Sequence, residues 1–173
     1  MASDANPDAL RRIAWRAGRK AHRGGRSNLL CVAEPLDVLA ELGSIADRVS
    51  VYLPWGELLR TVAGANPESL RHLAQLCLPD ATLDVVFSYD EEYDSRSVFP
   101  SDLATLSESH MRAHLPAQYG DAGFQIVKVD RIQNRELAAL ETTWSRRLAF
   151  GRPREVWRIR VVSRTLRQLN ADR

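Results

Sequence analysis

Two tryptophans occupy positions suited to binding a flat aromatic ligand. Trp55 lies in the run Leu53-Pro54-Trp55-Gly56, between an apolar strand pattern and a helix pattern, and Trp144 lies in ETTWSRRL, residues 141–148, at the start of an Arg-rich loop. Loops at the carboxyl ends of strands form the ligand sites of open α/β sheets, and two aromatic side chains there can hold a base between their rings. Packing in the core is the alternative, and it is the commoner role of a lone tryptophan.

Arginine at both ends of the chain favours an anionic partner. Residues 1–26 carry seven Arg or Lys against two acids, and residues 146–173 carry nine Arg against two acids, whereas residues 27–145 hold eight bases and eighteen acids. Arg binds phosphate through a bidentate fork, although a GC-rich genome also explains the use of Arg over Lys. The distribution favours a nucleic-acid-binding face. The basic segment Arg11–Arg23 either contacts phosphate or is the solvated side of an amphipathic helix.

Two clusters of metal-ligand residue types are weaker candidates. His110 and His114 have helical i, i+4 spacing with Glu108 nearby, but the sequence offers no evident third ligand, which favours an exposed helix face. The acidic run after residue 89 favours a solvated loop over a cation site; its members are Asp90, Glu91, Glu92 and Asp94. We therefore predict no metal site.

Strand and helix patterns alternate along the chain. A helix begins at Pro7, with Asn6 as its N-cap, and Gly24-Gly25 end it. Further helices are predicted over 36–42, 56–64, 67–78, within 101–121 and near 134–140, and strands over 28–33, 49–53, 81–88, 124–129 and 156–162. This alternation predicts an α/β fold with a largely parallel sheet covered on both faces. The last two strands lack a full crossover helix, which is compatible with an antiparallel hairpin at the sheet edge.

Length and composition indicate one globular domain over residues 1–173. The chain is 45% hydrophobic and 27% charged, which argues against disorder. No run reaches the roughly 18 uncharged apolar residues of a membrane span. Acids and bases among the first twenty residues argue against a secretory signal. Cys31 and Cys77 lie in apolar runs, which predicts reduced, buried thiols in a cytoplasmic protein.

The run VSVYLPWGELLR, residues 49–60, together with ETTWSRRL and Arg152-Pro153-Arg154, resembles the aminoglycoside-resistance methyltransferases of 16S ribosomal RNA. Those enzymes methylate N1 of adenosine 1408 in the decoding site, with S-adenosylmethionine (SAM) as cofactor on a class I methyltransferase (Rossmann-like) fold. The resemblance implies an rRNA adenine-N1 methyltransferase that acts on 16S rRNA in the small ribosomal subunit and confers aminoglycoside resistance. We expect a monomer.

The resemblance also assigns roles to residues. Trp55 and Trp144 match the two tryptophans that sandwich the flipped adenine, and Arg147, Arg152 and Arg154 match arginines that engage the rRNA. Stacking holds N1 in line with the methyl group, and the aromatic faces favour the cationic base that forms.

The cofactor residues implied by the resemblance come from three parts of the chain. Asp4 is similar to the acid that binds the SAM ribose, and Asp37 to the acid beside the adenine ring of SAM. The backbone near Leu53 lines the cofactor, and Thr142 helps to organise the cofactor and base pocket.

One departure from the family pattern is large. The chain has no GxG motif, and Asp4 already matches the end of the family's second strand, so the first strand, the first helix and most of the second strand are absent. A late start codon, a decayed gene copy, or a sheet closed by direct pairing of the strands at 28–33 and 49–54 would each account for this. Two alternative functions follow: an inactive RNA-binding remnant, or a methyltransferase of another RNA or a small heteroaromatic base.

Overall fold

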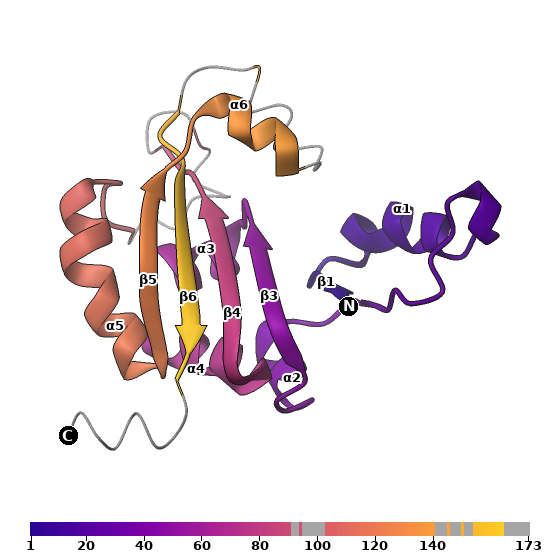
Figure 1. Ribbon diagram of the computed structural model, residues 1–173, viewed down its shortest axis with the longest axis horizontal. Helices are drawn as coiled ribbons and strands as arrows, with labels where there is room; N and C mark the ends of the chain where they lie inside the picture. Colours follow the sequence, from indigo (N-terminus) through magenta and orange to yellow (C-terminus); the bar gives the residue numbers. More distant parts are fainter. Residues whose placement is uncertain (91–93, 95–102, 141–144, 146–149, 151–153, 165–173) are drawn as a thin grey trace. The chain divides into compact units, whose positions relative to one another are not determined.

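The computed structural model describes all residues except 91–93, 95–102, 141–144, 146–149, 151–153 and 165–173. The described chain forms two compact units, Met1–Leu42 and Gly43–Arg173 (Figure 1). The expectation of a single domain stays a prediction.

The first unit contains a small parallel sheet and two helices. β1 (Ala2–Ser3) pairs with β2 (Cys31–Val32), and α2 (Leu36–Ala40) follows β2. β2 is shorter than the strand expected over 28–33. β2 and β3 belong to different sheets, so the suggested direct pairing between the strands at 28–33 and 49–54 is wrong.

α1 (Pro7–Ala17) begins as its sequence predicts and ends earlier. The Asn6 side chain accepts a hydrogen bond from the Asp8 N–H at 3.0 Å, and Pro7 occupies the first turn, where its missing N–H costs nothing. The α-helix stops at Ala17, and a 3-10 turn (Ala21–Arg23) carries the chain to Gly24, which has a left-handed φ of 82°. The two glycines therefore end this turn instead of one long helix.

The second unit is built on a four-stranded mixed sheet. Its strands are β3 (Ala46–Tyr52), β4 (Cys77–Phe87), β5 (Phe124–Arg131) and β6 (Trp157–Ser163), in the spatial order β3-β4-β6-β5. β3 and β4 are parallel, whereas β6 is antiparallel to both of its neighbours. The antiparallel pairing of β5 with β6 agrees with the hairpin that the sequence predicts. However, β6 lies between β4 and β5. In the described sheet, the neighbouring strands that run parallel are therefore β3 and β4.

The helices of this unit connect the strands. α3 (Gly56–Ala63) and α4 (Pro67–Leu76) follow β3, α5 (Leu115–Asp121) follows a π-helical turn at His110–His114, and α6 (Asn134–Leu137) continues into a 3-10 turn (Ala138–Leu140). Asn66 caps α4 by accepting hydrogen bonds from the Glu68 and Ser69 N–H groups at 3.0 and 3.2 Å. α4 ends at Leu76, two residues before the expected end, because Cys77 already pairs with Ala46 as the first residue of β4.

The two faces of the four-stranded sheet differ in chemistry. Alternate residues of β6, among them Ile159 and Val161, are buried on the face against which α3, α4 and α5 pack, and α3 and α4 lie behind the sheet in Figure 1. The residues between them, Arg158 and Arg160, point to the opposite face. On this opposite face, Leu137 of α6 packs against Val86 of β4, so a described helix covers it at the carboxyl ends of the strands.

The buried phenol of Tyr119 ties two of these helices together. Its hydroxyl donates a hydrogen bond to the Val62 carbonyl of α3 at 2.9 Å, and burial raises the pKa of the phenol. Cys77 is buried as its apolar run suggests, and this burial raises the pKa of its thiol to about 11. None of the described helices has the length and apolar character required to cross a membrane.

Candidate functional site

A strained turn follows the carboxyl end of β3. Leu53 has a φ of 51°, a value that non-glycine residues rarely adopt, and is only 6% exposed. Its N–H donates a hydrogen bond to the Val86 carbonyl at 2.7 Å, so the β3–β4 pairing continues into the turn. Gly56 has a φ of 55° and begins α3, where a side chain would be strained. Such outliers concentrate at functional sites, and Leu53 and Gly56 flank Pro54 and Trp55.

Trp55 is exposed at this turn. It is the N-cap residue of α3, in an extended conformation with φ −129° and ψ 164°, and the residue is 38% exposed. An indole in this position presents aromatic surface at the carboxyl edge of the sheet. This is the placement that the sequence predicts for a residue that stacks on a ligand.

An apolar cluster forms the floor beside the turn. β3, β4 and β5 point in the same direction, because β6 is antiparallel to both β4 and β5. Their carboxyl ends therefore meet at one edge, beside which α6 lies (Figure 1). The buried members of the cluster are Leu53, Val86, Leu137 and Val156, and Tyr52, Ile132 and Leu140 pack against them. The cluster joins the β3 turn to the segment that follows β5, which leads to residues 141–148.

Arg154 forms a bidentate ion pair with Asp94. Its two terminal nitrogens donate hydrogen bonds to the Asp94 carboxylate at 3.0 and 2.8 Å, and the side chains are 14% and 6% exposed. Asp94 also accepts a hydrogen bond from the Asp90 N–H at 2.9 Å. The solvated-loop interpretation is therefore wrong for Asp94, which the sequence analysis missed as a site residue. In the sequence, only the acidic run points to Asp94, because its partner Arg154 lies sixty residues further along the chain.

The two predicted cofactor acids lie in the first unit. Asp4 directly follows β1, and Asp37 lies in the first turn of α2, just after β2. Because β1 and β2 are parallel, their carboxyl ends share one edge of the small sheet. Both residues are exposed, and the Asp4 carboxylate accepts a hydrogen bond from the Asn6 N–H at 2.8 Å. Two carboxylates at one edge can accept hydrogen bonds from sugar hydroxyls.

Four predicted site residues lie outside the described residues: Thr142, Trp144, Arg147 and Arg152. Their roles stay predictions. Ser145, between them in sequence, is fully buried.

A polar network supports the strands below the turn. Asp84 of β4 accepts hydrogen bonds from Arg158 Nε and Nη2 at 2.7 and 2.6 Å and from the Tyr52 hydroxyl at 3.1 Å. Partial burial would raise the pKa of Asp84, but the hydrogen bonds and charge of Arg158 outweigh it and hold that pKa below its ordinary value. The same pairing raises the pKa of Arg158. The network links β3, β4 and β6 across their polar face.

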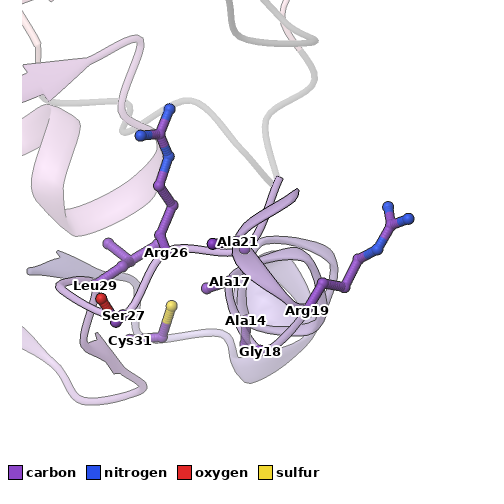
Figure 2. Close-up of a pocket in the computed structure, with 10 residues that line it drawn as sticks. Ala14, Ala17, Gly18, Arg19, Ala21, Arg26, Ser27, Leu29 and Cys31 are labelled. Atoms are coloured by element: carbon purple, nitrogen blue, oxygen red, sulfur yellow. The ribbon is translucent and has the colours of Figure 1, made fainter. Parts of the chain in front are cut away.

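The other candidate clusters bring no ligand set together. The rings of His110 and His114 stack with centroids 6.0 Å apart, and His110 Nε2 lies 2.9 Å from the Ala63 carbonyl. Within the described ranges no three His, Cys, Asp or Glu side chains form a group that could hold a metal ion. An open pocket of about 630 Å³ in the first unit lies between α1 and β2 (Figure 2). It contains none of the predicted site residues.

Comparison with known proteins identifies the family. The family model NpmA, described as 16S rRNA (adenine(1408)-N(1))-methyltransferase, matches residues 1–163. The chain belongs to this 16S rRNA (adenine(1408)-N(1))-methyltransferase family. A 16S rRNA (adenine(1408)-N(1))-methyltransferase of Escherichia coli is 32% identical over 143 residues, 82% of this chain and 65% of the relative. One from Streptoalloteichus hindustanus is 35% identical over 159 residues, 89% of this chain and 71% of the relative.

Solved structures of the methyltransferase family share the fold. The crystal structure of the 16S rRNA methyltransferase KamB is similar with a TM-score of 0.82 and 28% identity, covering 94% of this chain and 75% of that one. A mutant family member from Catenulisporales acidiphilia with the cosubstrate SAM has a TM-score of 0.80 and 28% identity, covering 95% and 75%. These similarities confirm the class I methyltransferase fold. The chain spans 65% of the length of the E. coli relative and 75% of the KamB chain.

Proposed function

We propose that this protein transfers a methyl group from SAM to N1 of an adenine in the decoding site of 16S rRNA, within the small ribosomal subunit, and so confers aminoglycoside resistance. The observation that carries the proposal is the strained turn of Leu53 to Gly56, which presents Trp55 at the carboxyl edge of a sheet whose fold is that of the family. Two named relatives act on this adenine.

Trp55 is assigned the aromatic face on which the flipped adenine stacks, and Trp144 the second face. Pulling the base from its helix costs a few kcal/mol, which stacking on aromatic side chains offsets. N1 carries a lone pair, so its attack requires no general base. Methylation makes the base cationic, and a tryptophan face stabilises a nearby cation by about 0.5–2 kcal/mol. Positioning and electrostatics thus account for the catalysis.

We assign phosphate contacts to Arg147 and Arg152. Arg154 is assigned a phosphate contact only when its ion pair with Asp94 opens. A phosphate contact positions RNA without reading its sequence, so loss of Arg147 or Arg152 weakens binding and leaves the choice of base unchanged. Asp94 occupies both terminal nitrogens of Arg154. Arg154 therefore serves mainly to bind Asp94, and contacts RNA only when that ion pair rearranges.

Two acids of the first unit are suited to hydrogen-bonding part of SAM. The Asp4 and Asp37 carboxylates lie at one edge of the small parallel sheet and suit the ribose hydroxyls and the neighbouring adenine edge. The Leu53 backbone is assigned one wall, and Thr142 the organisation of the pocket. SAM supplies the methyl group when it is bound. The protein's part is to hold N1 in line with that group and to exclude water.

Calorimetric titration of the 173-residue protein with SAM and with its demethylated product tests the cofactor site. Methyl transfer from radiolabelled SAM to intact small subunits tests the reaction, with free adenosine as the control. We expect saturable micromolar binding and label in 16S rRNA alone. Folded protein that binds subunits but not SAM would identify the RNA-binding remnant, and transfer to free adenosine would identify a methyltransferase of small bases.

A further inference from the structure

The outer side of α1 combines an exposed aromatic residue with exposed cations. Trp15 is 65% exposed, although it is the largest side chain of the helix, and the guanidinium carbon of Arg19 lies 5.2 Å from the centre of its ring. Leu10 is the buried residue of α1. Packing inside the first unit therefore does not explain why a tryptophan occupies this position.

The apolar side of α1 points elsewhere. Ala14 and Ala17 line the pocket beside Cys31 of β2, whereas the guanidinium group of Arg19 points away from it (Figure 2). Each residue along a helix turns by about 100°, so Trp15 lies on a different side from Ala14. Arg11 and Trp15 are four residues apart in α1, which places them in one row along the outer side, and Arg19, two residues beyond the end of the helix, lies over the Trp15 ring. We call these three residues the outer row.

The charge around the outer row indicates the chemistry of its partner. Seven basic residues of this segment are exposed, and its acids are Asp4 and Asp8, of which Asp8 already pairs with Arg11. The basic residues are Arg11, Arg12, Arg16, Arg19, Lys20, Arg23 and Arg26. A neutral protein surface would leave these cations without counter-charges. A helix that lies on a membrane points its apolar side outward, whereas α1 turns its apolar side to the pocket. RNA offers both phosphates and flat bases.

We propose that Trp15 stacks on an unpaired base of the rRNA, at a second contact separate from the target adenine, while the surrounding arginines bind phosphates. The Arg19 guanidinium group covers one face of the indole, and the base stacks on the opposite face. The inference rests on the proposed function, because it requires that the protein bind rRNA. Stacking is tolerant of sequence, so this contact contributes affinity and leaves the choice of target base to the first site.

The experiment measures the affinity of the full 173-residue protein for purified small ribosomal subunits over a range of salt concentrations. Trp15→Leu is expected to raise the Kd by about 5- to 150-fold, the range of base–aromatic stacking. The slope of log K against log salt should stay unchanged, since no phosphate contact is lost. Trp15→Phe keeps an aromatic ring and should recover most of the affinity.

Two variants on the same helix serve as controls. Ile13→Ala removes an apolar side chain that is 44% exposed and should leave the Kd unchanged. Arg16→Gln removes one exposed cation and should lower the salt slope by roughly one unit. Circular dichroism and thermal unfolding of each variant test whether the fold is retained. We expect that it is, because the substituted side chains are exposed.

Each outcome has a defined meaning. Equal affinities for wild type, Trp15→Leu and Trp15→Phe, with wild type bound tightly, would overturn the stacking inference and leave the proposed function intact. Failure of wild type to bind subunits would overturn both. Tight binding to vesicles of phosphatidylserine that Trp15→Leu abolishes, with subunit binding unaffected, would assign Trp15 to a membrane surface and also overturn the inference.

Discussion

At the scale of single residues, the ion pair between Asp94 and Arg154 is a buried contact of the described part of the site. Both side chains are largely buried, and removal of one partner leaves an uncompensated charge. We expect Asp94→Ala to lower the free energy of unfolding by about 3 kcal/mol. Urea denaturation monitored by circular dichroism measures this change.

An exposed ion pair of the same unit provides the control for Asp94→Ala. Arg131 and Glu155 form a pair whose side chains are 58% and 44% exposed, so Glu155→Ala should cost less than about 1 kcal/mol. The double variant Asp94→Leu with Arg154→Met should recover much of the stability, because neither charge remains. Equal costs for the buried and exposed pairs would contradict the assignment.

Trp55 tests the proposed stacking at the target base. Trp55→Ala removes the ring from an exposed N-cap position and should lower the rate of methyl transfer to small subunits by roughly 10- to 100-fold. Trp55→Phe should keep most of the rate. Initial rates with radiolabelled SAM check this, and an unchanged SAM affinity distinguishes a lost base contact from a collapsed pocket. Full activity of Trp55→Ala would remove the residue from the proposed site.

At the scale of elements, helix α4 depends on its cap. The Asn66 side chain satisfies two N–H groups in the first turn, at 3.0 and 3.2 Å. Asn66→Ala should therefore lower the free energy of unfolding by about 1 kcal/mol, whereas Asn66→Ser should cost only a few tenths. Thermal unfolding compares the two variants. Equal melting temperatures for the alanine and serine variants would show that the cap contributes little.

The network of Asp84 makes the sheet sensitive to acid. The pKa of Asp84 is lower in the folded protein than in the unfolded chain, so its contribution to stability is complete above the unfolded value. That contribution is lost as the pH falls from about 5 through the folded pKa. Asp84→Asn should flatten the fall in stability over this range. Urea denaturation at several pH values measures the slope, and Glu108→Gln, from an exposed pair with Arg112, should leave it unchanged.

At the scale of the whole molecule, the two units differ in how much apolar surface they bury. Three apolar residues are buried in Met1–Leu42, namely Leu10, Leu39 and Ala40, whereas the described part of the second unit buries most of its strand interiors and helix faces. Hydrophobic burial is the main favourable term in folding, so the units should differ in local stability. Hydrogen exchange should be slow in β4 and β6 and fast in α1. Equal protection would contradict this difference.

Local sequence signals determined many of the elements. Asn6 and Asn66, each followed by proline, mark the starts of α1 and α4, and the apolar runs mark the strands of the second unit. The run LPWG likewise placed Trp55 at the end of a strand. These features depend on hydrogen bonds and backbone preferences that involve only a few residues adjacent in sequence, so the local sequence is enough to predict them.

The tertiary structure alone decided the strand order and the ion pairs of the site. The insertion of β6 beside β4 reflects the fit of side chains across the whole sheet, and the sequence predicted only its hairpin with β5. Asp94 meets Arg154 across sixty residues, and Asp84 meets Arg158 across seventy-four. No local pattern selects such partners, because many acids and arginines of the chain have similar surroundings in sequence. Packing brings particular pairs together, and their shared burial then makes each pair costly to break.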